Sequence, residues 1–178
     1  MGNSPRSLVG KRLGLDMLTD DLLGKDYVPL LRAPDNRVVT VTTTNVTLTR
    51  ADYDGKHISL NRAAGITVTL PAAAEASVGT KFDFYIPTSL SGTTKIKCAN
   101  ASDTIMGRVQ VDASLASNAP VSFSAGSTAD TISLNGTTTG GKKGDHFTLF
   151  VLASNQWAAY GEIQSTGASA TPFVVSVS

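Results

Sequence analysis

The stretch that decides the fold is "NRAAGITVTLPAAAEASVGTKFDFYI", residues 61–86. Apolar and polar side chains alternate in two short runs of it, at residues 66–70 and 82–86. Strict alternation is typical of a strand with one buried face. Pro71 ends the first run because proline has no N–H to donate to a sheet, and "AAAEAS" predicts one helical turn. The stretch is therefore strand, loop, strand, without a residue pattern typical of catalysis.

The same two-residue alternation of apolar and polar side chains continues along most of the chain. Short alternating runs lie between residues 38 and 163, bounded by Gly, Asn, Asp, Ser and Pro, and "PFVVSVS" follows near the end. Many short strands with regular turn signals predict a sandwich or barrel, and one apolar face per strand favours antiparallel sheets. We therefore predict an all-β fold, an antiparallel β-sandwich or jelly-roll-like barrel. "FTLFVL" is the predicted central strand because both of its faces are apolar.

Two polar segments are interpreted as hairpin connections. Asp54-Gly55 in "RADYDGKH" (residues 50–57) is typical of a tight hairpin turn. "NGTTTGGKKGD" (residues 135–145) has glycines and lysines, but not in the order that a phosphate-binding loop requires. We expect a hairpin loop there.

Leucines distinguish the first segment, residues 1–37, from the rest. Leu15, Leu18 and Leu22 follow the three-four spacing of a short helix, which is marginal alone and must pack on something. We predict three parts: an arm for docking or oligomerisation at 1–37, a β-sandwich body at 38–163, and a C-terminal tail with a possible last strand at 164–178. The arm either packs on its own body or reaches another protein; we favour the second, because Pro34 and the polar "DNR" separate it from the body.

Composition and charge exclude several classes of protein. The net charge is +1 and charged residues are 16% of the chain, so the clustered cationic face of a nucleic-acid binder is not expected. Cys98 is the single cysteine, which excludes an internal disulfide, and we predict that it is buried. No run reaches the length of a membrane-spanning helix or a signal peptide, so we expect a soluble chain without a membrane partner.

The residues that carry chemistry are few and scattered. His57 and His146 each precede a predicted strand, without the spacing of a metal site. Glu75 and Glu162 are the two glutamates, and most aspartates fall in turns, so no carboxylate pair for glycoside cleavage stands out. Trp157 is interpreted as a core residue. We expect no catalysis, no metal and no cofactor.

Several elements between residues 51 and 163 resemble virion proteins of tailed bacteriophages. They are an "I-x-L…G-x-x-V-x-L-P" strand pair, a "G-x-x-F-x-F" strand, a "D-x-I-x-G" turn, a "G-D-x-F-x-L" strand and a late Trp. In these the chain is similar to the β-domains of head decoration (cement) proteins and of head or tail fibre proteins.

The resemblance implies a non-enzymatic structural protein, made in the host cytoplasm and located on the virion. It implies a decoration protein that binds the outside of a capsid and stabilises it, often as a homotrimer, with the major capsid protein as partner. The leucine-rich arm resembles a docking arm. The candidate contacts to the capsid or to a neighbouring protomer are Leu13, Leu15, Leu18, Leu22, Leu23, Leu30 and Leu31.

Two other functions stay open at this point. One is a head or tail fibre module that binds a host-surface receptor or polysaccharide, which would expose an aromatic sugar-binding surface. The other is a polysaccharide-degrading enzyme, which would need a carboxylate pair in a groove.

Overall fold

A computed structural model describes residues 37–113 and 119–177 of the chain. The arm leucines and the predicted arm helix lie outside the described residues. The elements within them are β1 (Val38–Val41), β2 (Asn45–Thr47), α4 (Arg50–Tyr53), β3 (His57–Leu60), β4 (Thr67–Thr69), α5 (Ala73–Ala76), β5 (Lys81–Tyr85), β6 (Thr94–Lys97), β7 (Thr104–Ala113), β8 (Val121–Ser124), β9 (Thr131–Leu134), β10 (His146–Ala153), β11 (Gln156–Ser165) and β12 (Phe173–Val174).

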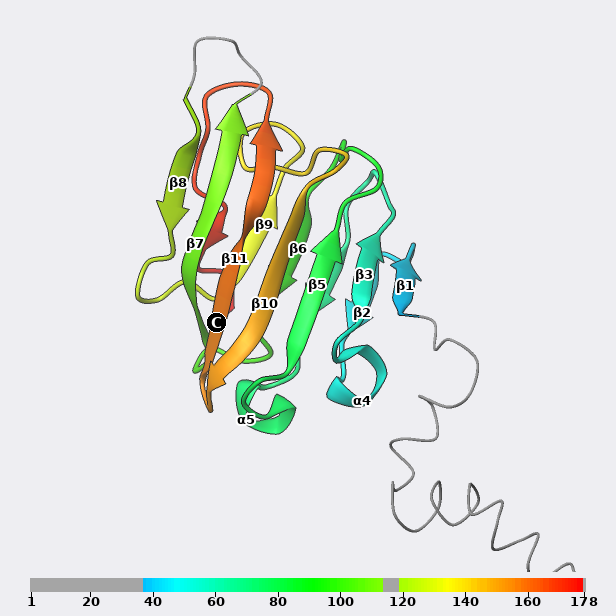
Figure 1. Cartoon of the computed structure of the whole chain (residues 1–178), viewed down its shortest axis with the longest axis vertical. Coiled ribbons are helices and arrows are strands. Elements are labelled where there is room, and N and C mark those ends of the chain that lie inside the picture. Colours follow the sequence, from blue (N-terminus) through cyan, green and yellow to red (C-terminus); the bar gives the residue numbers. More distant parts are fainter. Residues whose placement is uncertain (1–36, 114–118, 178) are drawn as a thin grey trace, which may run out of the picture. The chain divides into compact units, whose positions relative to one another are not determined.

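The strands form two sheets, and the all-β prediction is confirmed. Sheet A has seven strands in the order β1-β3-β5-β10-β11-β7-β8, and sheet B has five in the order β12-β9-β6-β4-β2. Figure 1 looks onto sheet A, with strands of sheet B behind it. Helix in the described residues is limited to single turns at α4 and α5, and α5 is the turn predicted from "AAAEAS". Neither helix has the length and apolar character needed to cross a membrane.

The prediction of antiparallel sheets is wrong for half of the strand pairs. β1, β3 and β5 run parallel to one another in sheet A, and β2, β4 and β6 do so in sheet B. The chain alternates between the sheets from β1 to β6, so each strand returns beside an earlier one in the same direction (Figure 1). Three two-stranded coils are stacked in this way, as in a short β-solenoid.

The two segments interpreted as hairpins are crossings between sheets. The segment containing α4 leads from β2 in sheet B to β3 in sheet A, and residues 135–145 lead from β9 in sheet B to β10 in sheet A. Turn residues mark a change of direction in both cases. They do not reveal whether the next strand pairs with the last one, and here it does not.

Antiparallel pairing dominates the later part of the chain. β10 pairs antiparallel with both β5 and β11, and β7 pairs antiparallel with β8, while β7 and β11 are parallel. β10 contains "FTLFVL" and is the fourth of seven strands in sheet A, which confirms it as a central strand.

One hydrophobic core takes the buried residues of both sheets. Trp157 is fully buried there, as predicted, and its ring stacks on Phe82 with the ring centres 5.6 Å apart. Phe84 and Phe147 stack in the same way at 5.2 Å. Each fully buried ring of this kind contributes about 1.5–3 kcal/mol relative to exposure. The inward half of each alternating strand therefore supplies the core, and the outward half is left for the surface.

Candidate binding face

The outward side chains of sheet A lie in rows, because the strand register places them directly beside one another. We call the face formed by these rows the outer face of sheet A. The first row is Thr40, Ser59, Tyr85, His146, Glu162, Gln110 and Ser122. The second row is Val38, His57, Asp83, Thr148, Tyr160, Arg108 and Ser124, and a third has Lys81, Phe150, Ala158 and Met106.

Large apolar side chains are exposed on this face. Tyr85 is 47% exposed and Tyr160 is 52% exposed, in neighbouring rows. Met106 is exposed in the third row. Single exposed apolar residues are ordinary, whereas several on one face mark a surface that contacts something.

Tyr85 and His146 form the aromatic centre of the first row. They are direct partners on β5 and β10, with ring centres 5.6 Å apart and planes inclined by 19°. Phe150 and Tyr160 form a second aromatic contact on the same face, edge to face at 6.2 Å. Central strands hold all four rings, so their positions are fixed by the sheet.

A polar cluster centred on Asp83 lies beside the aromatic pair. Thr148 Oγ1 donates a hydrogen bond of 2.7 Å to Asp83 Oδ1, and Lys81 Nζ lies 3.1 Å from Asp83 Oδ2. His57 Nδ1 lies 3.7 Å from the same Oδ2. The hydrogen bond to Asp83 raises the pKa of Lys81, so the ammonium group stays charged. One carboxylate thus organises three side chains from three strands.

A hollow of about 150 Å³ lies over this cluster. Its lining residues are His57, Asp83, Phe84, Tyr85, His146, Phe147 and Thr148. An aromatic wall with a few convergent polar groups is the composition typical of a small-ligand site.

Sequence reasoning identified some of these residues but not their arrangement. It singled out His57, His146 and Glu162, which the structure brings to the outer face of sheet A, whereas Glu75 lies in α5. It missed Tyr85, although the outward positions of "KFDFYI" and "HFTLF" carry a clear signal: they are polar or aromatic. No group of three or more His, Cys, Asp or Glu side chains that could hold a metal ion occurs among residues 37–113 and 119–177.

The buried aspartates hold loops in place. Asp145 accepts hydrogen bonds from the backbone N–H groups of Gly141, Lys142 and Gln164 at 2.7, 3.0 and 2.9 Å. Burial nevertheless raises its pKa above the usual value, against the effect of these bonds. Asp103 accepts from the N–H of Ala73 at 2.9 Å. The oxygens of these carboxylates are thus engaged in hydrogen bonds within the fold.

Asp130 and Cys98 are two further buried residues, and the Cys98 N–H donates a hydrogen bond of 2.9 Å to the Asp130 carbonyl oxygen. Asp130 accepts hydrogen bonds from the Thr131 hydroxyl at 2.7 Å and from the Ser176 N–H at 2.8 Å. Cys98 is buried, as predicted. Burial, with the nearby charges of Asp103 and Asp130, raises the pKa of Cys98 to about 12. The thiol is therefore a packing group without thiolate character at neutral pH.

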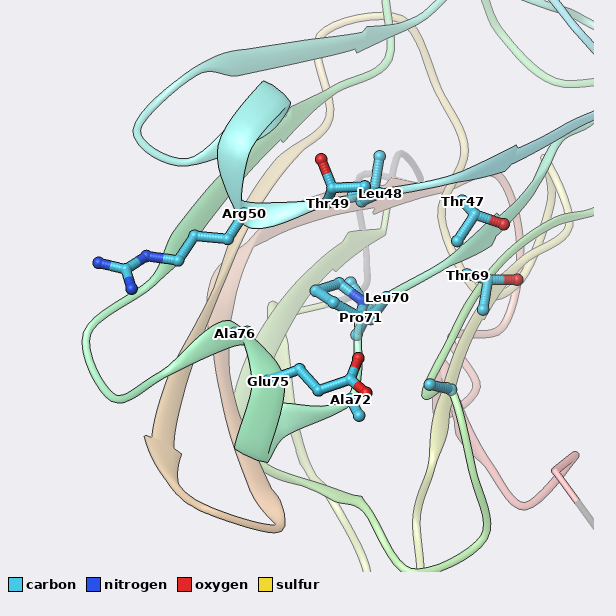
Figure 2. Close-up of a pocket in the computed structure, with 11 residues that line it drawn as sticks. Thr47, Leu48, Thr49, Arg50, Thr69, Leu70, Pro71, Ala72, Glu75 and Ala76 are labelled. Carbon is cyan, nitrogen blue, oxygen red and sulfur yellow. The ribbon is translucent and has the colours of Figure 1, made fainter. Parts of the chain in front are cut away.

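A larger hollow of about 360 Å³ lies where β2 and β4 end, between α4 and α5 (Figure 2). Its floor includes Leu48 and Leu70, which are buried. Figure 2 shows Arg50 pointing away from the hollow, where its Nε lies 3.6 Å from Asp54 Oδ2. The Glu75 side chain extends beside the hollow from α5. Among the described residues, no side-chain hydrogen bond or ion pair joins the lining residues of this hollow to one another. On the outer face of sheet A, Asp83 brings three side chains together, and that face is therefore our candidate site.

No protein-family model matches the chain, and a search of curated proteins gives no match. The candidate site therefore rests on the geometry described above.

Proposed function

We propose that the chain is a non-enzymatic virion structural protein that binds the outside of a phage capsid as a decoration protein and stabilises it. The proposal extends the resemblance in residues 51–163. In it, the leucines of residues 1–37 bind the major capsid protein or a neighbouring protomer. The protein acts as a homotrimer, which multiplies many weak contacts through effective concentration. The body is a β-sandwich.

The observation that carries the proposal is the role of the resembling residues within the body. Asp103 and Asp145 hold loops through backbone hydrogen bonds. Gly107 of "D-x-I-x-G" has φ +114°, and a Cβ atom there would lie 2.1 Å from the carbonyl oxygen of Ala159. Trp157 is fully buried. Each element occupies a position with a specific structural demand, which supports a shared β-body over a chance likeness of strands.

The use of the buried carboxylates also supports a structural role. Asp103, Asp130 and Asp145 accept hydrogen bonds from loop and terminal backbone groups, so their lone pairs stabilise the fold. A general acid in glycoside cleavage needs instead a raised-pKa carboxyl group that faces substrate beside a second carboxylate. Asp145 has a raised pKa, but both of its oxygens accept hydrogen bonds from backbone N–H groups of the fold.

Co-sedimentation with capsids tests the proposal. The full-length chain is mixed with emptied, expanded capsids of the phage that carries its gene, and bound protein is measured against free protein. We expect saturable binding in a fixed ratio to the capsid protein. Replacing Leu18 and Leu22 together by Ser should weaken attachment by orders of magnitude, because each buried leucine contributes about 1.5–3 kcal/mol.

The matched control replaces Val78 by Ser, since Val78 is a 70% exposed apolar residue of the body. This control should bind capsids as the wild type does. Absence of saturable binding by the wild-type chain would reject the decoration function. A leucine variant that melts much earlier but still decorates capsids would show that the arm belongs to the core.

A further inference from the structure

We propose that the outer face of sheet A binds a neutral saccharide, with Tyr85 and His146 as its aromatic platform and the Asp83 cluster as its hydrogen-bonding side. This inference goes beyond capsid attachment, and it concerns a surface formed by the strands of sheet A.

One face of the Tyr85 ring is available to a ligand. His146 covers the other side of the ring, with the ring centres 5.6 Å apart. The register neighbour on the opposite side, on β3, is Ser59, which is too small to cover a ring. Neighbouring strands lie about 4.8 Å apart, so a flat group can lie over Ser59 against Tyr85. The apolar C–H face of a sugar ring has that shape.

Hydrogen-bonding groups lie on the strand positions next to this one, two residues along β3 and β5. Asp83 is the residue two before Tyr85 on the same face of β5, and its oxygens already meet Thr148 and Lys81 at 2.7 and 3.1 Å. A carboxylate has about four lone-pair sites, so acceptor capacity remains beyond these contacts. Lys81 and His57 add donors. Hydroxyl groups that both donate and accept can satisfy this mixed set.

The charges of the face favour a neutral ligand. The titratable groups of the three rows are His57, Lys81, Asp83, Arg108, His146, Tyr160, Glu162 and Tyr85. Apart from the two histidines, the two cations Lys81 and Arg108 balance the two carboxylates Asp83 and Glu162. A polyanion such as a nucleic acid needs a face with excess positive charge, and the outer face of sheet A has none.

The same charges disfavour a protein partner. The buried centre of a protein–protein interface is depleted of charged residues, and burying a charge without a partner is costly. Lys81 and Asp83 lie next to the aromatic pair in the centre of the sheet, where a protein partner would have to desolvate them. A saccharide keeps them hydrogen-bonded, both through its own hydroxyls and through water.

The site is also organised in advance. Tyr85 and His146 belong to neighbouring central strands, and the hydrogen bond between Thr148 and Asp83 fixes the carboxylate. Little side-chain entropy is then lost when a ligand binds, which increases the affinity that a few contacts can give.

The test is a printed array of defined neutral and acidic bacterial oligosaccharides, probed with the full-length chain. The strongest neutral binder is then titrated by isothermal calorimetry against four variants. We expect Y85A to weaken its binding by about tenfold or more, because the ring contact is lost. D83N should weaken it similarly, whereas the exposed-surface control V78A should bind as the wild type does. Melting temperatures of all variants identify any that fold poorly, and H146A serves as a second ring deletion.

Several outcomes would overturn the proposal. One is that no neutral oligosaccharide binds the wild-type chain. Another is that Y85A and H146A bind the strongest neutral oligosaccharide as tightly as the wild type does. A third is that Y85A stops co-sedimenting with capsids, which would make the face a protein contact. The L18S/L22S variant separates the two proposals, because it should no longer bind capsids but should still bind the saccharide.

Discussion

Removal of the Asp145 carboxylate should destabilise the body by an amount that follows from its three hydrogen bonds. In D145A the N–H groups of Gly141, Lys142 and Gln164 lose their acceptor. Gly141 is buried, so its orphaned N–H costs about 1–3 kcal/mol, and the two less buried groups cost less because water replaces the carboxylate. The total is about 3 kcal/mol, or a fall in Tm of about 9 °C for a body of this size.

The pH dependence of stability gives a second readout of the same residue. Burial raises the pKa of Asp145 in the folded state above its unfolded value. Between these two pKa values the folded state binds more protons than the unfolded state, so stability falls as the pH rises through that window, which begins near pH 4. D145N removes this slope and keeps an oxygen acceptor, so it should cost less than D145A at neutral pH.

Differential scanning calorimetry at several pH values from about 3.5 to 7 measures both effects. The matched control is E75A, which removes an exposed carboxylate from α5 and should leave the Tm nearly unchanged. A Tm for D145A within about 2 °C of the wild type at pH 7 would refute the claim that Asp145 anchors this loop. A pH slope that persists in D145N would assign it to another group.

Three further predictions concern the fold, the thiol and the assembly. G107A should lower the free energy of unfolding, measured by urea titration, by more than the exposed control S124A does. The reason is that Gly107 has φ +114° and a Cβ atom there would lie 2.1 Å from the Ala159 carbonyl oxygen. Equal urea midpoints for the two variants would contradict this. Cys98 should react with Ellman's reagent at pH 8 far more slowly in native protein than in urea, because it is buried with a pKa of about 12; rapid native reaction would contradict its burial. Sedimentation velocity should show a homotrimer, free or on capsids, and a monomer in both conditions would reject the proposed assembly.

The strands could be predicted from the sequence, whereas their directions could not. Alternation in "ITVTLP" and "KFDFYI" follows from one buried face, and burial does not depend on how a neighbouring strand runs. β4 and β5, formed by these two runs, belong to different sheets. The residues between them fit a hairpin and a crossing equally well, because both need the same turn residues.

The candidate site, too, could be predicted from the sequence only in part. His57 and His146 stand out in the sequence because histidine is rare in this chain, and each precedes a run of alternating residues. Their presence around one hollow depends on β3, β5 and β10 being neighbours in that order. Neighbours so distant in sequence are fixed by the packing of the whole core, which no local pattern reports. The arm leucines, which rest on local spacing alone, stay a prediction.

The lengths of the outermost strands have a consequence for behaviour at high concentration. β1 and β8 have four residues each, β2 has three and β12 has two, whereas the inner strands β7 and β11 have ten each. An outermost strand offers unpaired N–H and C=O groups to other chains, and a short one offers too few for stable strand addition. Crowded copies of this body should therefore resist fusing into extended sheets, and should meet through side chains on their faces rather than through their backbones.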